Sequence, residues 1–193
     1  MPAAIGKQAP MTARDGDDTP PDHQLVAAAQ AGDKAAFDAL VARYQVQIEG
    51  FLRRDVGNAV RAADRAQDTF DEAYASLARL RAPPAFRAWL YGIASNLALM
   101  DHRWRRRQAT LALSALRSDM PAPSLTRLQI EEALGHLSPT LRRVLLLHDV
   151  EGYDVREIGT ILRISESAAQ KRLSRAHAAF RGLYADDDTP EGL

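Results

Sequence analysis

At 193 residues, of which 46% are hydrophobic, the chain is long enough for one domain or two small ones with buried cores. It contains no cysteine, which excludes disulfides, thiolate metal sites and thiol nucleophiles. Its 25 basic and 25 acidic residues give a formal net charge of zero. No apolar run is long enough for a membrane helix and the N-terminus lacks a secretory apolar segment, so we expect a cytoplasmic protein without membrane insertion.

The neutral total is an average over unlike segments. Acidic residues predominate in residues 1–22 and in the tail 185–193, so the residues between them carry the basic excess. A basic body between acidic ends favours a polyanionic partner, although acidic tails also serve solubility alone.

The first part of the chain predicts a disordered extension followed by a helical domain. Residues 1–21 are rich in proline and polar residues and form the extension. From Asp22 apolar residues recur at steps of three and four, with Asp33 as the N-cap of a helix that carries Phe37 to Phe51. A long helix is expected from about 62 to 80, buried along Ala66, Phe70, Ala73, Tyr74 and Leu77. Prolines at 83 and 84 end it, and another helix follows over about 86–107, which bounds a first domain at 22–107.

Periodicity is lost over residues 108–126, which predicts a flexible linker, and a second helical domain is expected over 127–184, before the acidic tail 185–193. Ser138 and Pro139 indicate a helix start, and that helix ends around Gly152. Asp154 and Glu157 have capping-box spacing and begin a short helix. The fold class is therefore all-α, with two small helical domains joined by a linker.

The last helix is basic on one face and apolar on the other. Ser165 is its expected cap, and from Ser167 to Arg181 it contains no acidic residue. One face is formed by Ala169, Leu173, Ala176 and Phe180, and the other by Gln170, Lys171, Ser174 and Arg175. Two short helices joined by a tight turn, the second of them basic, form a helix-turn-helix, whose Arg, Lys and Gln side chains suit guanine, phosphate and adenine. The alternative is an ordinary solvated helix.

Nothing in the sequence indicates catalysis. The five histidines, His23, His102, His136, His148 and His177, show no metal-ligand spacing, and no phosphate loop or nucleophile–base arrangement occurs. We therefore expect no catalytic residues, no metal site and no cofactor.

Two blocks of the chain contain recognisable motifs. The second block contains Leu137-Ser138-Pro139, the run from Leu145 to Gly152, Glu157-Ile158-Gly159 and the run from Arg172 to Ala176. The first block contains the segments AADRAQDTFDEAYASL and FRAWLYGIASNLALMDHRWRRR. These motifs resemble region 4 and region 2, respectively, of the extracytoplasmic-function (ECF) sigma factors, the two-domain branch of the sigma-70 family of RNA polymerase initiation factors. The resemblance covers about 22–184.

The resemblance implies binding to core RNA polymerase, recognition of the −35 and −10 promoter elements, and DNA melting, with no enzymatic activity. Region 4 would contact the polymerase flap, and region 2 its clamp coiled coil. The implied −35 residues are Gln170, Lys171, Arg172, Ser174 and Arg175. The implied −10 and melting residues are Arg81, Phe86, Arg87, Asn96, Arg103, Trp104, Arg105, Arg106 and Arg107. The implied docking residues are Asp64, Gln67, Asp68 and Glu72.

Three departures from the family pattern stand out. The acidic cluster that opens the family's docking helix is replaced by Arg61, Ala62, Ala63 and Asp64, which predicts weaker docking and motivates the hypothesis that phosphorylation of Thr69 or Ser76 restores negative charge. Where the family has a glycine in the turn, this chain has Arg163, which predicts mild strain or an added phosphate contact. The acid that follows Asn96 is displaced by one position, to Asp101.

Alternatives are a stand-alone helix-turn-helix transcriptional regulator and a sigma factor that is inactive until phosphorylated. An anti-sigma factor or a kinase is the expected regulator.

Overall fold

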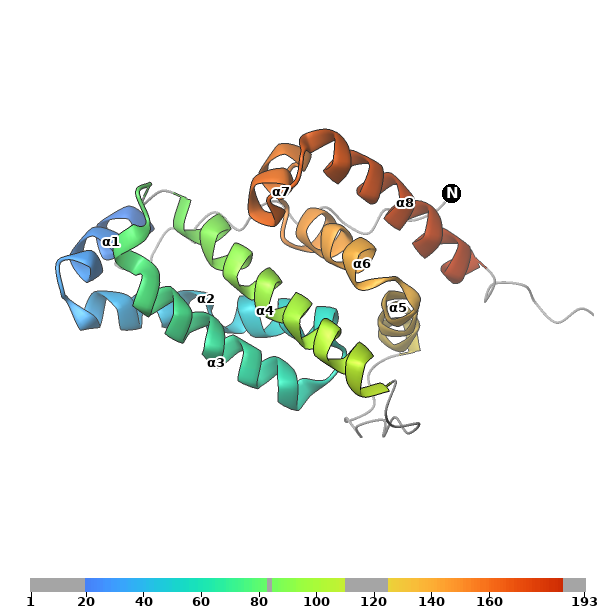
Figure 1. Ribbon diagram of the computed structural model, residues 1–193, viewed down its shortest axis with the longest axis horizontal. Coiled ribbons are helices and arrows are strands. Elements are labelled where there is room, and N and C mark those ends of the chain that lie inside the picture. Colours follow the sequence, from blue (N-terminus) through green and yellow to red (C-terminus); the bar gives the residue numbers. More distant parts are fainter. Residues whose placement is uncertain (1–19, 83–84, 110–124, 186–193) are drawn as a thin grey trace, which may run out of the picture. The chain divides into compact units, whose positions relative to one another are not determined.

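The computed structural model describes residues 20–82, 85–109 and 125–185, which form two compact helical units. The first unit holds α1 to α4 and the second holds α5 to α8 (Figure 1). No strand occurs in these ranges, so the predicted all-α, two-domain fold is confirmed. Nor does any helix within them have both the length and the apolar character that a bilayer crossing requires. The predictions for residues 1–19, for 110–124 of the linker and for 186–193 of the tail fall outside the described residues.

The first unit is a helical bundle in which α2, α3 and α4 pack against one another and α1 packs on α2. Its elements are α1 (Asp22–Gln30), α2 (Lys34–Val56), α3 (Ala59–Ser76), a 3-10 turn η1 (Leu77–Arg79) and α4 (Phe86–Ala109).

Capping residues set the helix boundaries of this unit. The Asp33 side chain accepts a hydrogen bond from the backbone N–H of Ala36 at 3.3 Å, as predicted. Asn58 accepts one from the N–H of Arg61 at 3.0 Å, and α3 therefore begins earlier than the predicted residue 62. At its other end α2 stops at Val56. Its C-cap, Gly57, has a φ of 70°, a left-handed conformation that favours glycine.

Aromatic rings fill the core of the first unit. Phe51, Phe86 and Tyr91 are fully buried, and the rings of Phe51 and Tyr91 meet edge to face at 5.3 Å. The predicted buried stripe of α3 is correct for Phe70 but wrong for Tyr74, which is 54% exposed. The Tyr74 ring instead lies against Phe37 at 4.9 Å, at the edge of the core rather than inside it.

The second unit consists of α5 (Leu125–His136), α6 (Pro139–Leu145), a π-helical turn η3 (Leu146–Val150), α7 (Val155–Leu162) and α8 (Glu166–Ala185). α8 packs on α5, α6 and α7. The helix predicted to run from Ser138 to near Gly152 is thus α6 prolonged by η3, and a wider π turn closes it. Gly152, at φ 78°, follows the C-cap residue Glu151 and has a left-handed backbone that favours glycine.

A buried arginine joins the first two helices of the second unit. Arg142, only 7% exposed, donates hydrogen bonds through Nη2 to the carbonyl oxygens of Gly135 at 2.8 Å and Leu137 at 3.0 Å. These carbonyls lie at the C-terminal end of α5, where the helix itself provides no N–H partner. A residue of α6 therefore completes the end of α5.

Candidate nucleic-acid interface

The turn between α7 and α8 positions the basic helix. Asp154 accepts from the N–H of Glu157, and Glu157 accepts from the N–H of Asp154, both at 2.8 Å, so the predicted capping box is confirmed. Arg163 ends α7 in the left-handed region, at φ 53°. The predicted strain is therefore real, because a side chain occupies backbone space that suits glycine.

A glycine brings α7 against the turn. A Cβ on Gly159 would lie 3.0 Å from the carbonyl oxygen of Ile164, closer than nearly all real contacts of this kind. The Ser165 Oγ then accepts from the N–H of Ala168 at 3.2 Å and caps α8 as expected.

α8 divides into a buried face and an exposed face, as the sequence predicted. Ala169, Leu173, Ala176 and Phe180 are all buried. On the opposite face Gln170, Lys171, Ser174 and Arg175 are exposed, and Arg172 is half-buried. The Ser174 hydroxyl donates to the carbonyl oxygen of Gln170 at 3.0 Å, so its hydrogen is already used within the helix. We define Gln170, Lys171, Ser174 and Arg175 as the reading face.

A second exposed stripe runs along α4. Asn96, Arg103 and Trp104 are exposed, and Trp104 is 56% exposed despite its large ring. Their spacing of seven and eight residues places them on one side of the helix, together with Met100, which is 62% exposed. Met100 was not predicted, although its position four residues after Asn96 places it on the same side of the helix. We define Asn96, Met100, Arg103 and Trp104 as the α4 stripe.

Three predicted −10 residues make contacts within the fold. Phe86 is fully buried against Tyr44, with ring centroids 5.8 Å apart, so its predicted contact with an extruded base is wrong. Arg87 lies over the Tyr91 ring at 5.4 Å, a cation–π contact, and Arg105 donates to the carbonyl oxygen of Val56 at 3.2 Å.

The remaining −10 candidates occupy less defined positions. Arg81 is exposed before the segment 83–84, which is not described. Arg106 and Arg107 lie within α4, in a part whose side chains are not described.

The predicted docking residues lie on α3. Asp64, Gln67 and Glu72 are exposed. Asp68 pairs with Arg65 at 2.7 Å, with 45% of its side chain exposed. Gln67 donates to Asp71 at 3.1 Å, and both line a groove between α2 and α3 whose floor includes Phe70. Asp71 is an acid on this surface that the sequence analysis missed.

Two of the departures from the family pattern are neighbours in space. Arg61 of α3 lies 3.9 Å from the carboxylate of Asp101 of α4, whose side chain is 5% exposed. The cation that replaces a docking acid is thus the partner of the displaced acid. Burial of a lone carboxylate is costly, so each residue accounts for the presence of the other.

The two hydroxyls proposed for phosphorylation differ in access. Thr69 is fully buried and donates to the carbonyl oxygen of Arg65 at 2.7 Å, so the folded unit does not present it to a kinase, and that hypothesis is corrected. Ser76 is half-buried and donates to the carbonyl oxygen of Glu72 at 2.6 Å.

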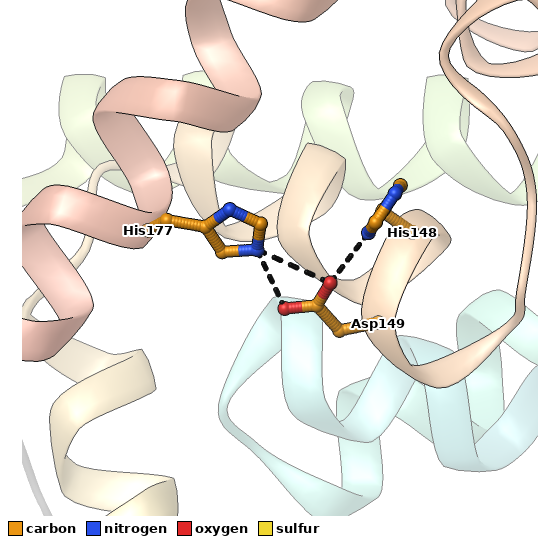
Figure 2. Close-up of side chains that lie close together, drawn as sticks. All are labelled: His148, Asp149 and His177. Atoms are coloured by element: carbon orange, nitrogen blue, oxygen red, sulfur yellow. Dashed lines mark hydrogen bonds and ion pairs between the residues drawn. The ribbon is translucent and has the colours of Figure 1, made fainter. Parts of the chain in front are cut away.

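The second unit also brings together two histidines and an aspartate that the sequence analysis regarded as scattered. Figure 2 shows His148 and His177 both directed at the carboxylate of Asp149. The His148 Nδ1 lies 2.5 Å from Asp149 Oδ1, and the His177 Nε2 lies 2.9 Å from Oδ2. Asp149 and His177 are 28 positions apart in the sequence, so local spacing does not reveal this cluster.

Comparison with known proteins agrees with both units. The family model described as Sigma-70 region 2 matches residues 40–110, and the one described as Sigma-70, region 4 matches residues 127–179. The RNA polymerase sigma-H factor of Pseudomonas aeruginosa is 35% identical over 179 residues, which cover 82% of this chain and 91% of that protein. The ECF RNA polymerase sigma factor SigM of Mycobacterium tuberculosis (strain ATCC 25618 / H37Rv) is 28% identical over 185 residues, which cover 95% of this chain and 94% of that protein.

Two solved structures are similar to this chain in fold. CnrH, solved in complex with the cytosolic domain of CnrY, matches with a TM-score of 0.67 and 30% identity over 87% of this chain and 99% of that one. RpoE of Bartonella quintana, solved in complex with the anti-sigma factor NepR, matches in fold with a TM-score of 0.68 and 23% identity, over 79% and 98%.

The fold and the exposed basic helix define a two-unit transcription protein with a helix-turn-helix. The chain belongs to the sigma-70 family and is an RNA polymerase sigma factor of the ECF type. Such proteins are initiation factors rather than enzymes. A stand-alone helix-turn-helix regulator is not favoured, because the region 2 model matches as well.

Proposed function

We propose that the second unit, with its domain at 127–184, recognises the −35 promoter element through the reading face of α8. The observation that carries this proposal is a face that exposes two cations and an amide while the opposite side of the same helix is buried. Lys171 and Arg175 supply hydrogen bonds to bases or phosphates, Gln170 suits adenine, and half-buried Arg172 suits a phosphate. No acidic side chain from Ser167 to Arg181 repels the DNA backbone.

For the first unit, with its domain at 22–107, we propose recognition and melting of the −10 element along the α4 stripe. Asn96 offers an amide to a base edge, and Trp104 and Met100 offer apolar surface on which an unstacked base packs. Arg81, Arg103, Arg106 and Arg107 supply phosphate contacts. Phe86 and Arg105 are assigned to the fold that supports this surface, and Arg87 holds Tyr91.

We further propose that α3 docks on the clamp coiled coil of core RNA polymerase. The contact residues are Asp64, Gln67, Asp68 and Glu72, joined by Asp71. Because Arg61 stands where the family has an acid, we expect slower association than in relatives with the full acidic cluster. The second unit contacts the polymerase flap. Of the two hydroxyls considered for phosphorylation, Ser76 is the one accessible enough to be modified, and a phosphate there would add negative charge to α3.

The regulatory partner is proposed from the relatives. CnrH is seen with the cytosolic domain of CnrY, and RpoE of Bartonella quintana with the anti-sigma factor NepR. We propose that an anti-sigma factor likewise binds this chain, and that the chain acts in the bacterial cytoplasm, where RNA polymerase works.

The test is transcription by core RNA polymerase on a library of randomised promoters, with and without the protein. We expect protein-dependent transcripts whose templates share two sequence elements. Arg175→Ala should relax the selection in the upstream element only, and Trp104→Ala should reduce opening at the downstream one. Tight DNA binding without transcripts and without affinity for core polymerase would contradict the proposal.

A further inference from the structure

Three potential metal ligands converge on one side of the second unit. His148 and Asp149 lie on the π turn η3, and His177 lies on α8. One nitrogen from each ring and one carboxylate oxygen all lie within 4.8 Å of one another. The side chains are 33%, 23% and 37% exposed, so an ion can reach them from solvent while protein covers the rest of the site.

The geometry is close to what a small divalent cation requires. Tetrahedral zinc bonds histidine nitrogen and carboxylate oxygen at about 2.0–2.2 Å, so its ligand atoms stand about 3.3–3.6 Å apart. Here the contacts of the carboxylate with the rings are 2.5 Å to His148, and 2.9 and 3.2 Å to His177. With Oδ1 as the carboxylate ligand, the His148 ring must move away by about 0.8–1.1 Å and the His177 ring by about 0.1–0.4 Å for an ion to enter between them.

The chemistry of the donors selects the ion. We propose that His148, Asp149 and His177 bind a borderline divalent transition metal of the Zn²⁺ or Co²⁺ type. Two imidazoles and one carboxylate suit such ions, whereas Ca²⁺ and Mg²⁺ prefer oxygen ligands. Soft ions such as Cu(I) favour thiolates, and the chain contains no cysteine.

Metal binding involves no redox step: each neutral ring moves its one hydrogen to its other nitrogen, by exchange with water, and no bond to carbon is made or broken. In the metal-free site the carboxylate accepts a hydrogen from each ring, through His148 Nδ1 and His177 Nε2. With a metal bound, each of these nitrogens presents a lone pair, and a neutral ring carries its hydrogen on its other nitrogen. The three protein donors leave a fourth position for water or for a residue of a partner, as in open zinc sites.

The position of the cluster gives the ion a structural consequence. His177 lies on the same helix as Arg175 of the reading face, and η3 is the turn that closes α6. A bound ion would therefore hold α8, two residues beyond Arg175, to the π turn that closes α6. Any effect on promoter recognition rests on the proposed function, whereas metal binding itself does not.

The competing interpretation is that Asp149 only ties the two rings together by hydrogen bonds. That arrangement also stabilises the contact of η3 with α8, and it predicts no affinity for metals. The two interpretations differ in a direct binding measurement, which needs neither DNA nor polymerase.

The experiment titrates the untagged full-length chain with ZnCl2 by calorimetry and with CoCl2 by visible absorption. We expect one ion per chain, d–d bands of four-coordinate Co²⁺ that Zn²⁺ abolishes, and a melting temperature raised by about 5 °C or more at a hundredfold excess over the Kd. His177→Gln and Asp149→Asn should each weaken Zn²⁺ binding by more than about tenfold.

The matched control is His136→Gln, because His136 is an exposed histidine of the same unit outside the cluster. This variant should bind Zn²⁺ like the parent. Circular dichroism of every variant establishes that the helices remain, and His148→Gln provides an independent third ligand change. Unchanged Zn²⁺ affinity in the three cluster variants, or no saturable binding by the parent, overturns the proposal. If the cluster variants lose Zn²⁺ binding but support transcription like the parent, the metal site is confirmed and only its effect on promoter recognition is contradicted.

Discussion

The two units differ in how much of their predicted functional surface is free. On α8 every residue of the reading face is exposed, and among the residues that the structure describes the only hydrogen bond from a side chain of that face is the one that Ser174 makes to its own helix. In the first unit Phe86 is buried, Arg105 bonds to Val56, and Asp68 pairs with Arg65. α8 packs with one face and exposes the other, whereas charged side chains of α3 and α4 also make contacts within their own bundle. DNA-contacting residues are therefore easier to predict on a helix whose polar face makes few contacts within the protein.

The largest effect should come from removing the aromatic residue that sequence reasoning had assigned to DNA. Phe86→Ala should destabilise the first unit by about 3–5 kcal/mol, because it leaves a cavity in the core. Urea denaturation measures this. Trp104→Ala, on the exposed α4 stripe, is the matched control and should change stability by less than about 0.5 kcal/mol while it impairs promoter opening. Similar stability losses in both variants would remove the distinction between core and surface that we draw here.

A smaller effect is expected at the pair of Arg61 and Asp101. Arg61→Glu restores the acid that the family has, but it places two carboxylates together and should cost about 2 kcal/mol of stability, less than for a fully buried pair because Arg61 is partly exposed. The double variant Arg61→Glu with Asp101→Asn removes the repulsion. It should recover most of the stability and bind core polymerase more tightly than the parent. A double variant as unstable as the single one would show that the two residues are not coupled.

The reading face should respond in binding rather than in folding. Arg175→Ala should weaken specific promoter binding by about 1–3 kcal/mol if Arg175 contacts a guanine, with no change in the free energy of unfolding. Arg181→Ala, an exposed arginine farther along α8, is the control. Competition between matched and mismatched promoter fragments measures the effect. An equal loss on all sequences would reassign Arg175 to a phosphate.

The smallest effect is expected at the turn. Arg163→Gly should stabilise the second unit by about 0.5–1 kcal/mol, because glycine adopts the left-handed backbone at φ 53° without a Cβ penalty. Thermal unfolding measures this gain. If Arg163 also contacts a phosphate, the same variant should lower DNA affinity on every sequence and flatten its salt dependence. A stabilised protein with unchanged DNA affinity would leave strain as the whole account of Arg163.

The helix caps and the buried face of α8 could be predicted from the sequence, because their signals come from residues close together in the chain. Asp33, the capping box at Asp154 and Glu157, and the buried seam of α8 each depend on neighbours within four residues. The pairing of Arg61 with Asp101 and the cluster of His148, Asp149 and His177 could not be predicted. They depend on which turns of distant helices meet, and no spacing along the chain records that. Tyr74 fits the apolar periodicity of α3 but lies at the rim of the bundle, where periodicity does not distinguish rim from centre.

The bond from Arg142 to the end of α5 has a mechanical consequence. α5 is the helix through which the residues between the two units connect to the second unit. A guanidinium that holds the carbonyls of Gly135 and Leu137 passes tension from α5 into α6 instead of letting the last turn of α5 peel away. This guanidinium is buried, and an arginine keeps its charge at physiological pH, so the connection does not depend on a group that titrates there. We therefore expect a pull on the chain ahead of α5 to be transmitted to α6 through this guanidinium.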